Sequence, residues 1–164
     1  MDDLLPEICD QFEESAHWIP LQWIDVGGKP VFYGPVETLR CFEDNSKVRE
    51  LLGQPGYGRI LVVDGQGSRR RALLGDQLAL KAVENGWSGV VVVGYVRDVA
   101  TIGKLDLGVK ALGVCPVKTE KRGLGDVGEE LRVEGISVCP GDYLYADKNG
   151  VVISKDELDL SLLS

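Results

Sequence analysis

Histidine is almost absent from this chain of 164 residues: His17, near the N-terminus, is the only one. Catalytic zinc sites and the Ser-His-Asp and Cys-His types of nucleophilic site all depend on histidine held by core elements. The scarcity of histidine therefore argues against all three kinds of active site.

Cysteine is also sparse, with four residues spread widely along the chain. They are Cys9, Cys41, Cys115 and Cys139, and no two form a C-x-x-C pair. This spacing does not predict structural zinc or a disulfide framework. We therefore expect reduced thiols in a cytoplasmic protein.

Long apolar runs and an excess of basic charge are lacking as well. No apolar run approaches the roughly 20 residues that span a bilayer, and the acidic N-terminal sequence does not read as a signal peptide. The net charge is −8, whereas a nucleic-acid surface needs a basic footprint. We expect neither a membrane partner nor direct nucleic-acid binding. Arg69-Arg70-Arg71, with Lys118, Lys121 and Arg122 further on, leaves open a local patch for an acidic ligand or partner.

The length and the 44% hydrophobic content fit one domain, spanning residues 1–164, with a sizeable core. Glycine is frequent, with 21 residues that gather in loops after predicted strands. Glycine there allows the backbone to come close to a ligand or a neighbouring subunit.

The centre of the chain has the pattern of a βαβ unit. Two β-branched runs, within 59–68 and 89–98, flank an amphipathic helical pattern at 74–86. This arrangement is typical of parallel strands joined by a crossover helix. Ligands of open α/β sheets bind beyond the carboxyl ends of such strands.

Polar and glycine residues occupy the positions where these elements end or begin. Asp64, Gly65 and Gly67 follow the first strand, Arg97-Asp98 follows the second, and Asp76 begins the helix. We therefore expect these residues to converge on one edge of the sheet.

The flanking segments predict further helices and strands around this unit. Before this unit we expect an amphipathic helix within 2–16, strands on both sides of Gly34-Pro35, and a helix from Asn45 or Ser46 to Leu52. After it we expect an exposed or mobile loop at 118–130, a strand at 131–139, and a hairpin that turns at Asn149-Gly150. The predicted fold class is a mixed α/β sandwich in which helices cover a central sheet and a second small sheet lies alongside.

Each candidate motif also has a purely structural interpretation. Gly65-Gln-Gly67 is not a dinucleotide fingerprint, because Arg70 stands where the third glycine belongs. Asp76 is a good helix N-cap, while the free N–H groups at Gly75–Leu78 can also hold an anion. Arg97-Asp98 is compatible with a surface ion pair. It equally offers a bidentate grip on a carboxylate and a hard oxygen ligand for Mg²⁺ or Mn²⁺.

Asp76, twenty intervening residues and then Arg97-Asp98 resemble the D-x20-R-D pattern of class II 4-hydroxy-4-methyl-2-oxoglutarate (HMG) aldolases. Further stretches resemble the RraA branch of that family, named for regulator of ribonuclease activity A. They are 41–45, 62–68, 70–73, 106–112, 144–147 and 149–150. The resemblance covers nearly the whole chain. It implies an α-β-β-α sandwich of the swivelling β/β/α type, assembled as a homotrimer or a hexamer with its site between subunits.

The resemblance also implies roles for individual residues. Asp98 binds a divalent metal, Mg²⁺ or Mn²⁺, mostly with waters in the other positions. Arg97 and the backbone of Gly75, Asp76, Gln77 and Leu78 hold the carboxylate and carbonyl of a small 2-oxo acid, and Asp76 orients or activates a water. The implied activities are cleavage of HMG to two pyruvates and decarboxylation of oxaloacetate.

Other members of the family bind ribonuclease E and inhibit it, which is the alternative function. Such members can lack one of the acidic residues, whereas this chain keeps Asp76, Arg97 and Asp98. The aldolases also place a further acid near the metal from a neighbouring chain. Asp126, Glu129 and Glu130 are the candidates for that acid here.

Overall fold

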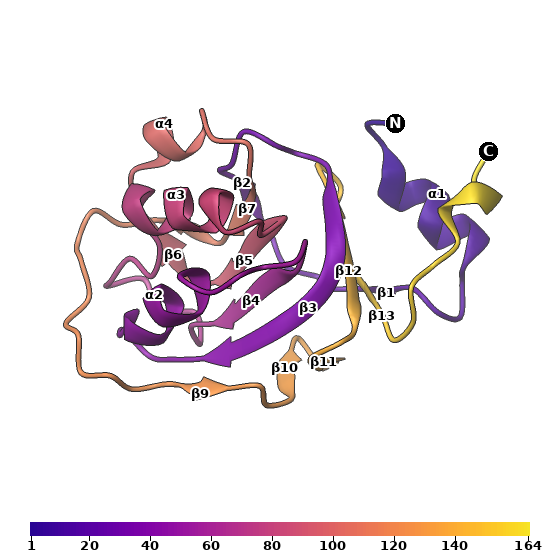
Figure 1. Ribbon diagram of the computed structural model, residues 1–164. Helices are drawn as coiled ribbons and strands as arrows, with labels where there is room; N and C mark the ends of the chain where they lie inside the picture. The colour runs from indigo at the N-terminus through magenta and orange to yellow at the C-terminus, as the bar shows by residue number, and fades with distance from the viewer.

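A nine-stranded, curled sheet forms the centre of the computed structural model, which describes residues 1–164 (Figure 1). In order across the sheet the strands are β1 (His17–Trp18), β13 (Gly150–Ser154), β12 (Tyr143–Asp147), β3 (Phe32–Arg40), β4 (Ile60–Asp64), β5 (Gly89–Val93), β7 (Gly108–Ala111) and β2 (Ile24–Asp25), with β9 (Asp126–Val127) paired to β3. β3, β4, β5 and β7 run parallel, and the strands at both ends are antiparallel.

Two short sheets and five helical segments complete the fold. The sheets are β10 (Leu131–Val133) with β11 (Ile136–Val138), and β6 (Tyr95–Val96) with β8 (Gly113–Val114). The helices are α1 (Leu4–Gln11), α2 (Ser46–Leu52), α3 (Asp76–Glu84), α4 (Val99–Ile102) and the 3-10 helix η1 (Leu160–Leu162). None of the helices has the length and apolar character needed to cross a membrane.

The parallel strands are buried on both faces, as a continuous β-branched run predicts. In β4, Leu61 and Val63 join the core beneath α2 and α3, while Ile60 and Val62 join the core on the opposite face. Figure 1 shows α2, α3 and α4 together on the first of these faces. The hairpin β10–β11 contributes Leu131 to the opposite core.

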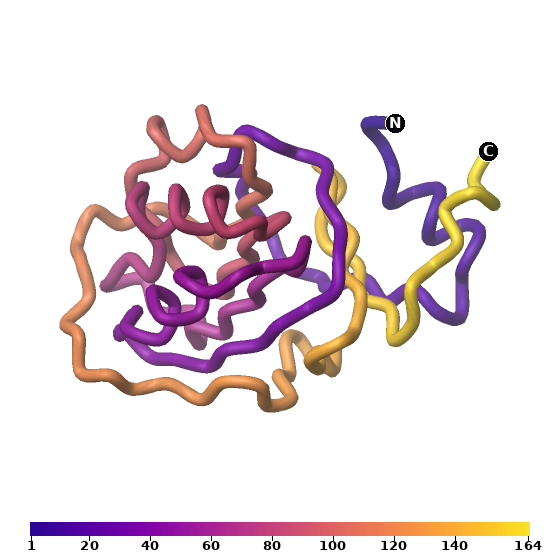
Figure 2. The backbone as a smooth tube through the Cα atoms, in the orientation of Figure 1, coloured from indigo at the N-terminus to yellow at the C-terminus, as the bar shows by residue number.

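The two ends of the chain pack against the antiparallel part of the sheet. Leu4, Leu5 and Ile8 of α1 form a separate small core with Tyr145 of β12 and Leu158 of the C-terminal segment. Figure 2 shows the N-terminal and C-terminal segments side by side at this end of the molecule. The parallel strands and their helices lie at the other end, where the pocket described below is found.

The predicted βαβ unit is confirmed as β4–α3–β5, with Ile60 of β4 opposite Gly89 of β5 in parallel register. The fold class is confirmed as mixed α/β, with helices over a curled sheet and a small second sheet alongside. The helix predicted from Asn45 or Ser46 to Leu52 is α2, and the predicted hairpin is β12–β13.

Two predictions of strands were wrong. Gly34-Pro35 does not interrupt β3, which pairs with β12 as far as Pro35 and with β4 from Val36 onward. Proline, which cannot donate to a ladder, lies where the strand changes partners. The segment 131–139 is a hairpin, because Glu134 and Gly135 both take positive φ values (50° and 78°) that turn the chain back.

Candidate active site

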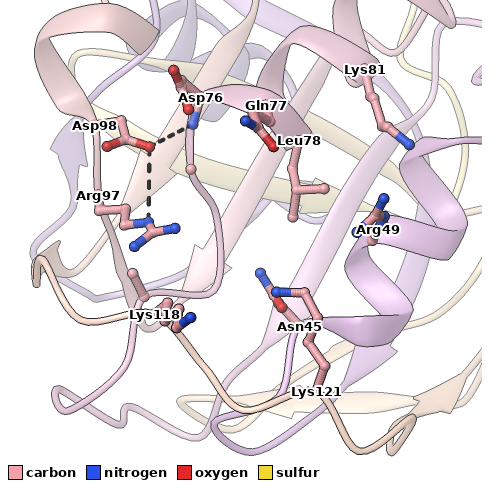
Figure 3. Close-up of a pocket in the computed structure, with 12 residues that line it drawn as sticks. Asn45, Arg49, Asp76, Gln77, Leu78, Lys81, Arg97, Asp98, Lys118 and Lys121 are labelled. Atoms are coloured by element: carbon pink, nitrogen blue, oxygen red, sulfur yellow. Dashed lines mark hydrogen bonds and ion pairs between the residues drawn. The ribbon is translucent and has the colours of Figure 1, made fainter.

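A polar pocket lies at the N-terminus of α3, where four segments of the chain meet. Its lining residues are Asn45, Arg49, Ala72, Gly75, Asp76, Gln77, Leu78, Lys81, Arg97, Asp98, Lys118 and Lys121. Figure 3 shows their side chains, which come from α2, α3, the β6–α4 corner and the segment after β8. The cavity measures about 170 Å³, a size that suits a small organic acid.

Hydrogen bonds between backbone groups fix the segment that leads into α3. Leu73 N donates to Tyr95 O (2.9 Å), Arg97 N donates to Leu74 O (2.9 Å), and Ala72 N donates to Val117 O (2.7 Å). The segment 72–74 therefore runs between β6 and the chain that follows β8. These bonds bring Gly75 and the corner at Arg97 to the same wall of the pocket.

Asp98 adopts a left-handed backbone conformation (φ 59°, ψ 38°) at the start of α4. Few residues other than glycine do so, although aspartate tolerates it better than most. Its Oδ2 accepts a hydrogen bond from Asp76 N (2.9 Å) and lies 3.9 Å from Arg97 Nε (Figure 3). The turn thus aims the carboxylate at the positive end of the α3 dipole.

Gly75 allows this close approach of the corner to the helix. A Cβ atom at Gly75 would stand 2.8 Å from Asp98 Oδ2 and 3.3 Å from Arg97 Nε. The backbone of Gly75 is extended (φ −129°), so the requirement for glycine comes from crowding by these side chains and not from its dihedral angles.

Asp76 is the first residue of α3, and Gly75 occupies the N-cap position without a side-chain cap. The cap interpretation of Asp76 is therefore wrong. Its carboxylate makes no hydrogen bond or ion pair within the chain, and the residue is half-buried in the pocket wall. The carboxylate remains available to a ligand or a water.

Positive charge dominates the pocket even though the protein as a whole carries −8. Five lining side chains are cationic and two are acidic, which gives the lining a net charge of +3. Only Arg97 among the five has a carboxylate within 4 Å; the others, Arg49, Lys81, Lys118 and Lys121, have none. Unpaired cations that face one cavity favour an anionic ligand with more than one negative charge.

The loop that carries Lys118 and Lys121 is fastened by the buried Asp44. Asp44 Oδ2 accepts from Arg122 N (2.9 Å) and Leu124 N (3.1 Å), while its Oδ1 accepts from both N and Oγ of Ser46 (2.9 and 2.6 Å). The expectation of an exposed loop holds for most of its side chains, although Thr119 is buried, and these bonds tie its backbone to the start of α2. Sequence patterns could not predict this because the contacts join segments about 78 residues apart.

We expect Asp44 to make stability depend on pH in the acid range. Burial raises its pKa, but the hydrogen bonds from Ser46, Leu124 and Arg122 outweigh this and lower the pKa to about 2, against 3.8 ordinarily. Its contribution is therefore complete above about pH 4 and is lost as pH falls toward about 2. At neutral pH, Asp44→Asn should reduce the free energy of unfolding by roughly 2 kcal/mol.

Chemical denaturation of the wild type and Asp44→Asn between pH 7 and pH 2.5 measures this effect. The stability difference between the two proteins should shrink below about pH 4. A difference that stays constant across that window would show that Asp44 is not the group responsible.

The structure brings together Gly75, Asp76, Gln77, Leu78, Arg97 and Asp98, all of which the sequence had singled out. It leaves Asp64, Gly65 and Gly67 outside the pocket. Asp64 instead accepts from Gln66 N and faces Arg40 (3.8 Å). Gly65 permits tight packing against Leu73, because a Cβ there would stand 2.4 Å from Leu73 Cδ1. These three residues follow β4 at the edge of the sheet but do not line the pocket, because Gly65 N and Gly67 N both donate to Val93 O of β5 (3.0 and 3.2 Å).

The candidate acids and the arginine cluster from the sequence also lie outside this pocket. Asp126, Glu129 and Glu130 belong to the strip around β9 and β10, where Glu129 faces Arg40 (3.6 Å). In the basic cluster, Arg70 is paired with Glu43 (2.8 Å) and Arg71 donates to Lys118 O (3.1 Å). Arg70 and Arg71 therefore help to pack their own loop, whereas Lys118 and Lys121, which the sequence grouped with them as a patch for an acidic ligand, line the pocket.

Sequence reasoning missed the cations that complete the pocket from α2 and α3. Lys81 follows Gln77 by four residues, a spacing that places both on one face of a helix, so this residue could have been found. Arg49 gave no such signal, because the contact between α2 and α3 is set by the tertiary fold.

Asp98 offers the donor chemistry for one kind of metal site. The chain contains no group of three His, Cys, Asp or Glu side chains arranged to hold an ion, which disfavours a closed all-protein site such as structural zinc. Mg²⁺ and Mn²⁺ suit a single carboxylate with several waters. One oxygen of Asp98 accepts from Asp76 N and the other is free, so the residues present fit a cation held in that manner.

Comparisons with known proteins agree with the observed fold. The family model RraA-like (Aldolase/RraA) matches residues 5–153. A protein of Photobacterium profundum is 57% identical over 163 residues, which cover 99% of this chain and all of that protein. One of Vibrio cholerae is 48% identical over 98% of this chain and all of that protein. Both are provisionally named 4-hydroxy-4-methyl-2-oxoglutarate aldolase.

Two solved structures are similar over almost their whole length. The RNA-processing inhibitor RraA from Thermus thermophilus has a TM-score of 0.90 and 42% identity, covering 94% of this chain and 93% of that one. A Geobacillus kaustophilus structure has a TM-score of 0.92 and 46% identity, covering 94% and 96%. It is described as an S-adenosylmethionine:2-dimethylmenaquinone methyltransferase. Three different activities are thus attached to proteins that share this fold.

Proposed function

The chain belongs to the RraA-like (Aldolase/RraA) family, and from that premise we propose that it is a divalent-metal-dependent lyase. Its proposed reactions are cleavage of HMG to two pyruvates and decarboxylation of oxaloacetate. The proposal rests on one observation: Arg97, Asp98 and the N-terminus of α3 lie together in one small cationic pocket.

Both reactions pass through the enolate of pyruvate. In HMG the 4-hydroxyl loses its proton, the C3–C4 bond breaks to release one pyruvate, and C3 of the enolate left behind takes up a proton. In oxaloacetate the C3–C4 bond breaks to release CO₂ and leaves the same enolate. A site that stabilises the negative charge of the enolate therefore serves both substrates.

Arg97 and the first turn of α3 would hold the 2-oxo acid group. The Arg97 guanidinium presents a planar fork that matches a carboxylate. The N–H groups of Gln77 and Leu78 have no partner within the helix, as at any helix N-terminus, and they can bind carboxylate or carbonyl oxygen. Asp98 would hold the metal. When bound, a divalent cation supplies Lewis-acid stabilisation of the developing negative charge.

Asp76 is the residue that we assign to proton transfer. Its carboxylate lines the pocket without any partner in the chain, while its own N–H fixes Asp98. A carboxylate so placed can take a proton from the 4-hydroxyl or return one to C3, directly or through one water.

The stoichiometry of pyruvate tests this proposal directly. We expect two molecules of pyruvate per HMG consumed and one per oxaloacetate, at rates above those given by the metal ion alone. A folded protein that leaves both substrates at the metal-only rate would refute the lyase.

Gly75→Ala should impair catalysis without unfolding the protein. The added methyl group meets Asp98 Oδ2 at 2.8 Å and Arg97 Nε at 3.3 Å, and both side chains must shift. Misplacement of catalytic groups by about 1 Å can cost roughly 10²-fold in rate, and we expect a loss of that size in kcat/KM with the melting temperature little changed.

Gly53→Ala is the matched control, because Gly53 caps α2 in a right-handed conformation outside the pocket. Steady-state rates and thermal melts of both variants measure whether Gly75→Ala lowers kcat/KM without lowering the melting temperature. Equal activity of Gly75→Ala and wild type would contradict the assigned geometry.

Pocket size and charge favour the lyase over the methyltransferase named for the Geobacillus relative. A volume of about 170 Å³ is small for S-adenosylmethionine, since drug-sized ligands occupy pockets of roughly 300–1,000 Å³. The cationic lining is also poorly suited to a sulfonium cofactor, whereas it suits a small anion of more than one charge.

The second candidate function is binding and inhibition of ribonuclease E, which the similarity to the Thermus thermophilus RNA-processing inhibitor favours. Inhibition that persists in Asp98→Asn would assign it to a surface separate from the pocket. Absence of inhibition by the wild type would remove this candidate.

We also propose a homotrimer or a dimer of trimers in the cytoplasm. Several apolar side chains are exposed in the single chain, among them Val114, Val117 and Leu124, and burial against a neighbouring copy would cover them. A neighbour could also supply Asp126, Glu129 or Glu130 as the additional acid.

A further inference from the structure

We propose that Arg49 and Lys81 bind a second carboxylate of the substrate and thereby make the pocket selective for dicarboxylic 2-oxo acids. This inference rests on the proposed lyase function, since it identifies which end of the substrate each side of the pocket receives. Figure 3 shows Arg49 and Lys81 beside each other, on the side of the pocket away from Arg97 and Asp98.

The position of Lys81 along α3 sets the distance between the two ends of the pocket, one for the 2-oxo acid group and one for the second carboxylate. Gln77 belongs to the first turn, where the 2-oxo acid group is expected, and Lys81 follows it by four residues on the same face. One helical turn advances about 5.4 Å. This is comparable with the separation of the two carboxyl groups in an extended five-carbon diacid, the backbone of HMG.

Arg49 reaches the same end from the neighbouring helix. Val48, Leu51 and Leu52 of α2 are buried in the core that α2 shares with α3. Arg49 therefore falls on the solvent side of α2 and lines the pocket. A guanidinium and an ammonium from two helices can together bind one carboxylate, because both are donors and neither is an acceptor.

The absence of counter-ions distinguishes these two cations from others nearby. Lys47, on the same helix as Arg49, is paired with Glu50 (3.1 Å), and Arg59 is paired with Glu37 (3.2 Å). Neither Arg49 nor Lys81 has a carboxylate within 4 Å. Two adjacent like charges repel one another, and an anionic ligand between them relieves that repulsion.

A matched pair of ligands separates the two ends of the pocket. 2-Oxoglutarate and 2-oxopentanoate have the same five-carbon chain and the same 2-oxo acid group, and only 2-oxoglutarate has a distal carboxylate. Neither carries the 4-hydroxyl needed for cleavage. Isothermal titration calorimetry in the presence of Mg²⁺ should measure both ligands against wild type, Lys81→Gln, Arg49→Gln and the control Lys29→Gln. Lys29 is exposed and lies outside the pocket.

We expect the wild type and Lys29→Gln to bind 2-oxoglutarate at least about tenfold more tightly than 2-oxopentanoate. Lys81→Gln and Arg49→Gln should each reduce this preference several-fold or more, while 2-oxopentanoate binds as before. Equal affinities in the wild type, or a preference that both variants retain, would overturn the inference.

Binding requires no turnover, so the result is independent of the lyase assay. Loss of the preference in both variants supports the distal subsite even if HMG is not cleaved. Pyruvate release by a protein whose variants keep the preference would leave the lyase intact and refute the subsite.

Discussion

Asp98→Asn is expected to lower kcat/KM for both HMG and oxaloacetate by at least about 10³-fold, which corresponds to several kcal/mol of lost transition-state stabilisation. Asparagine tolerates the left-handed backbone of this position, and its amide oxygen can still accept the hydrogen bond from Asp76 N. The fold and the corner should therefore persist. A neutral amide is a much weaker ligand for a divalent cation than a carboxylate.

Initial rates of pyruvate release, together with thermal melts, measure this effect. Asp106→Asn is the matched control, because Asp106 is exposed and does not line the pocket. Activity of Asp98→Asn within a few-fold of the wild type would mean that Asp98 does not hold a metal on which the reaction depends.

Arg97→Lys should reduce kcat/KM by about 10²-fold, although the charge is conserved. An ammonium group is a point charge that cannot reproduce the two parallel hydrogen bonds of a guanidinium with a carboxylate. The loss corresponds to about 2.7 kcal/mol, close to the value of a charge-assisted hydrogen bond. The backbone contact from Arg97 N to Leu74 O is unaffected by the side chain, and so the wall of the pocket should stay in place.

Steady-state kinetics of Arg97→Lys and of the exposed control Arg69→Lys, with both substrates, test this expectation. If the substitution acts only through charge, the two variants will behave alike. Nearly wild-type activity in Arg97→Lys would therefore rule out a bidentate grip on the substrate carboxylate.

The end of the pocket that contains Asp76, Arg97 and Asp98 could be predicted from the sequence because it depends on local connections. β4, α3 and β5 are each marked by their own periodicity, and parallel strands bring their carboxyl ends to one edge. Asp76 and Asp98 therefore had to lie near each other once the βαβ unit was identified. The structure adds the hydrogen bond from Asp76 N to Asp98 Oδ2, which depends on the left-handed turn at Asp98.

The cationic end could not be predicted in the same way because it depends on contacts between distant segments. Arg49 enters the pocket only because α2 packs beside α3. Lys118 and Lys121 stood out in the sequence as basic residues, but their place in this pocket depends on Asp44, which fastens a loop that has no periodic pattern of its own. Asp64 stays outside the pocket, although it also follows a strand of the βαβ unit, since the next residue is bonded to β5 through Gly65 N and Val93 O.

The distribution of charge would allow an acidic protein to attract the acidic substrate that we propose. The lining of the pocket carries +3 within a chain of net charge −8. Charges of one sign that line a cleft focus the electric field there and raise the local concentration of oppositely charged ligands. The net charge of the chain is therefore a poor guide to the charge of its pocket.

The most direct test of the account is pyruvate release from HMG by the wild-type protein, measured with Mg²⁺ or Mn²⁺ and again with EDTA. The account predicts turnover well above the metal-only rate, complete loss of that turnover in EDTA, and its recovery when the metal ion is returned in excess. Turnover that is indifferent to EDTA, or no turnover from the folded protein with either metal, would contradict it.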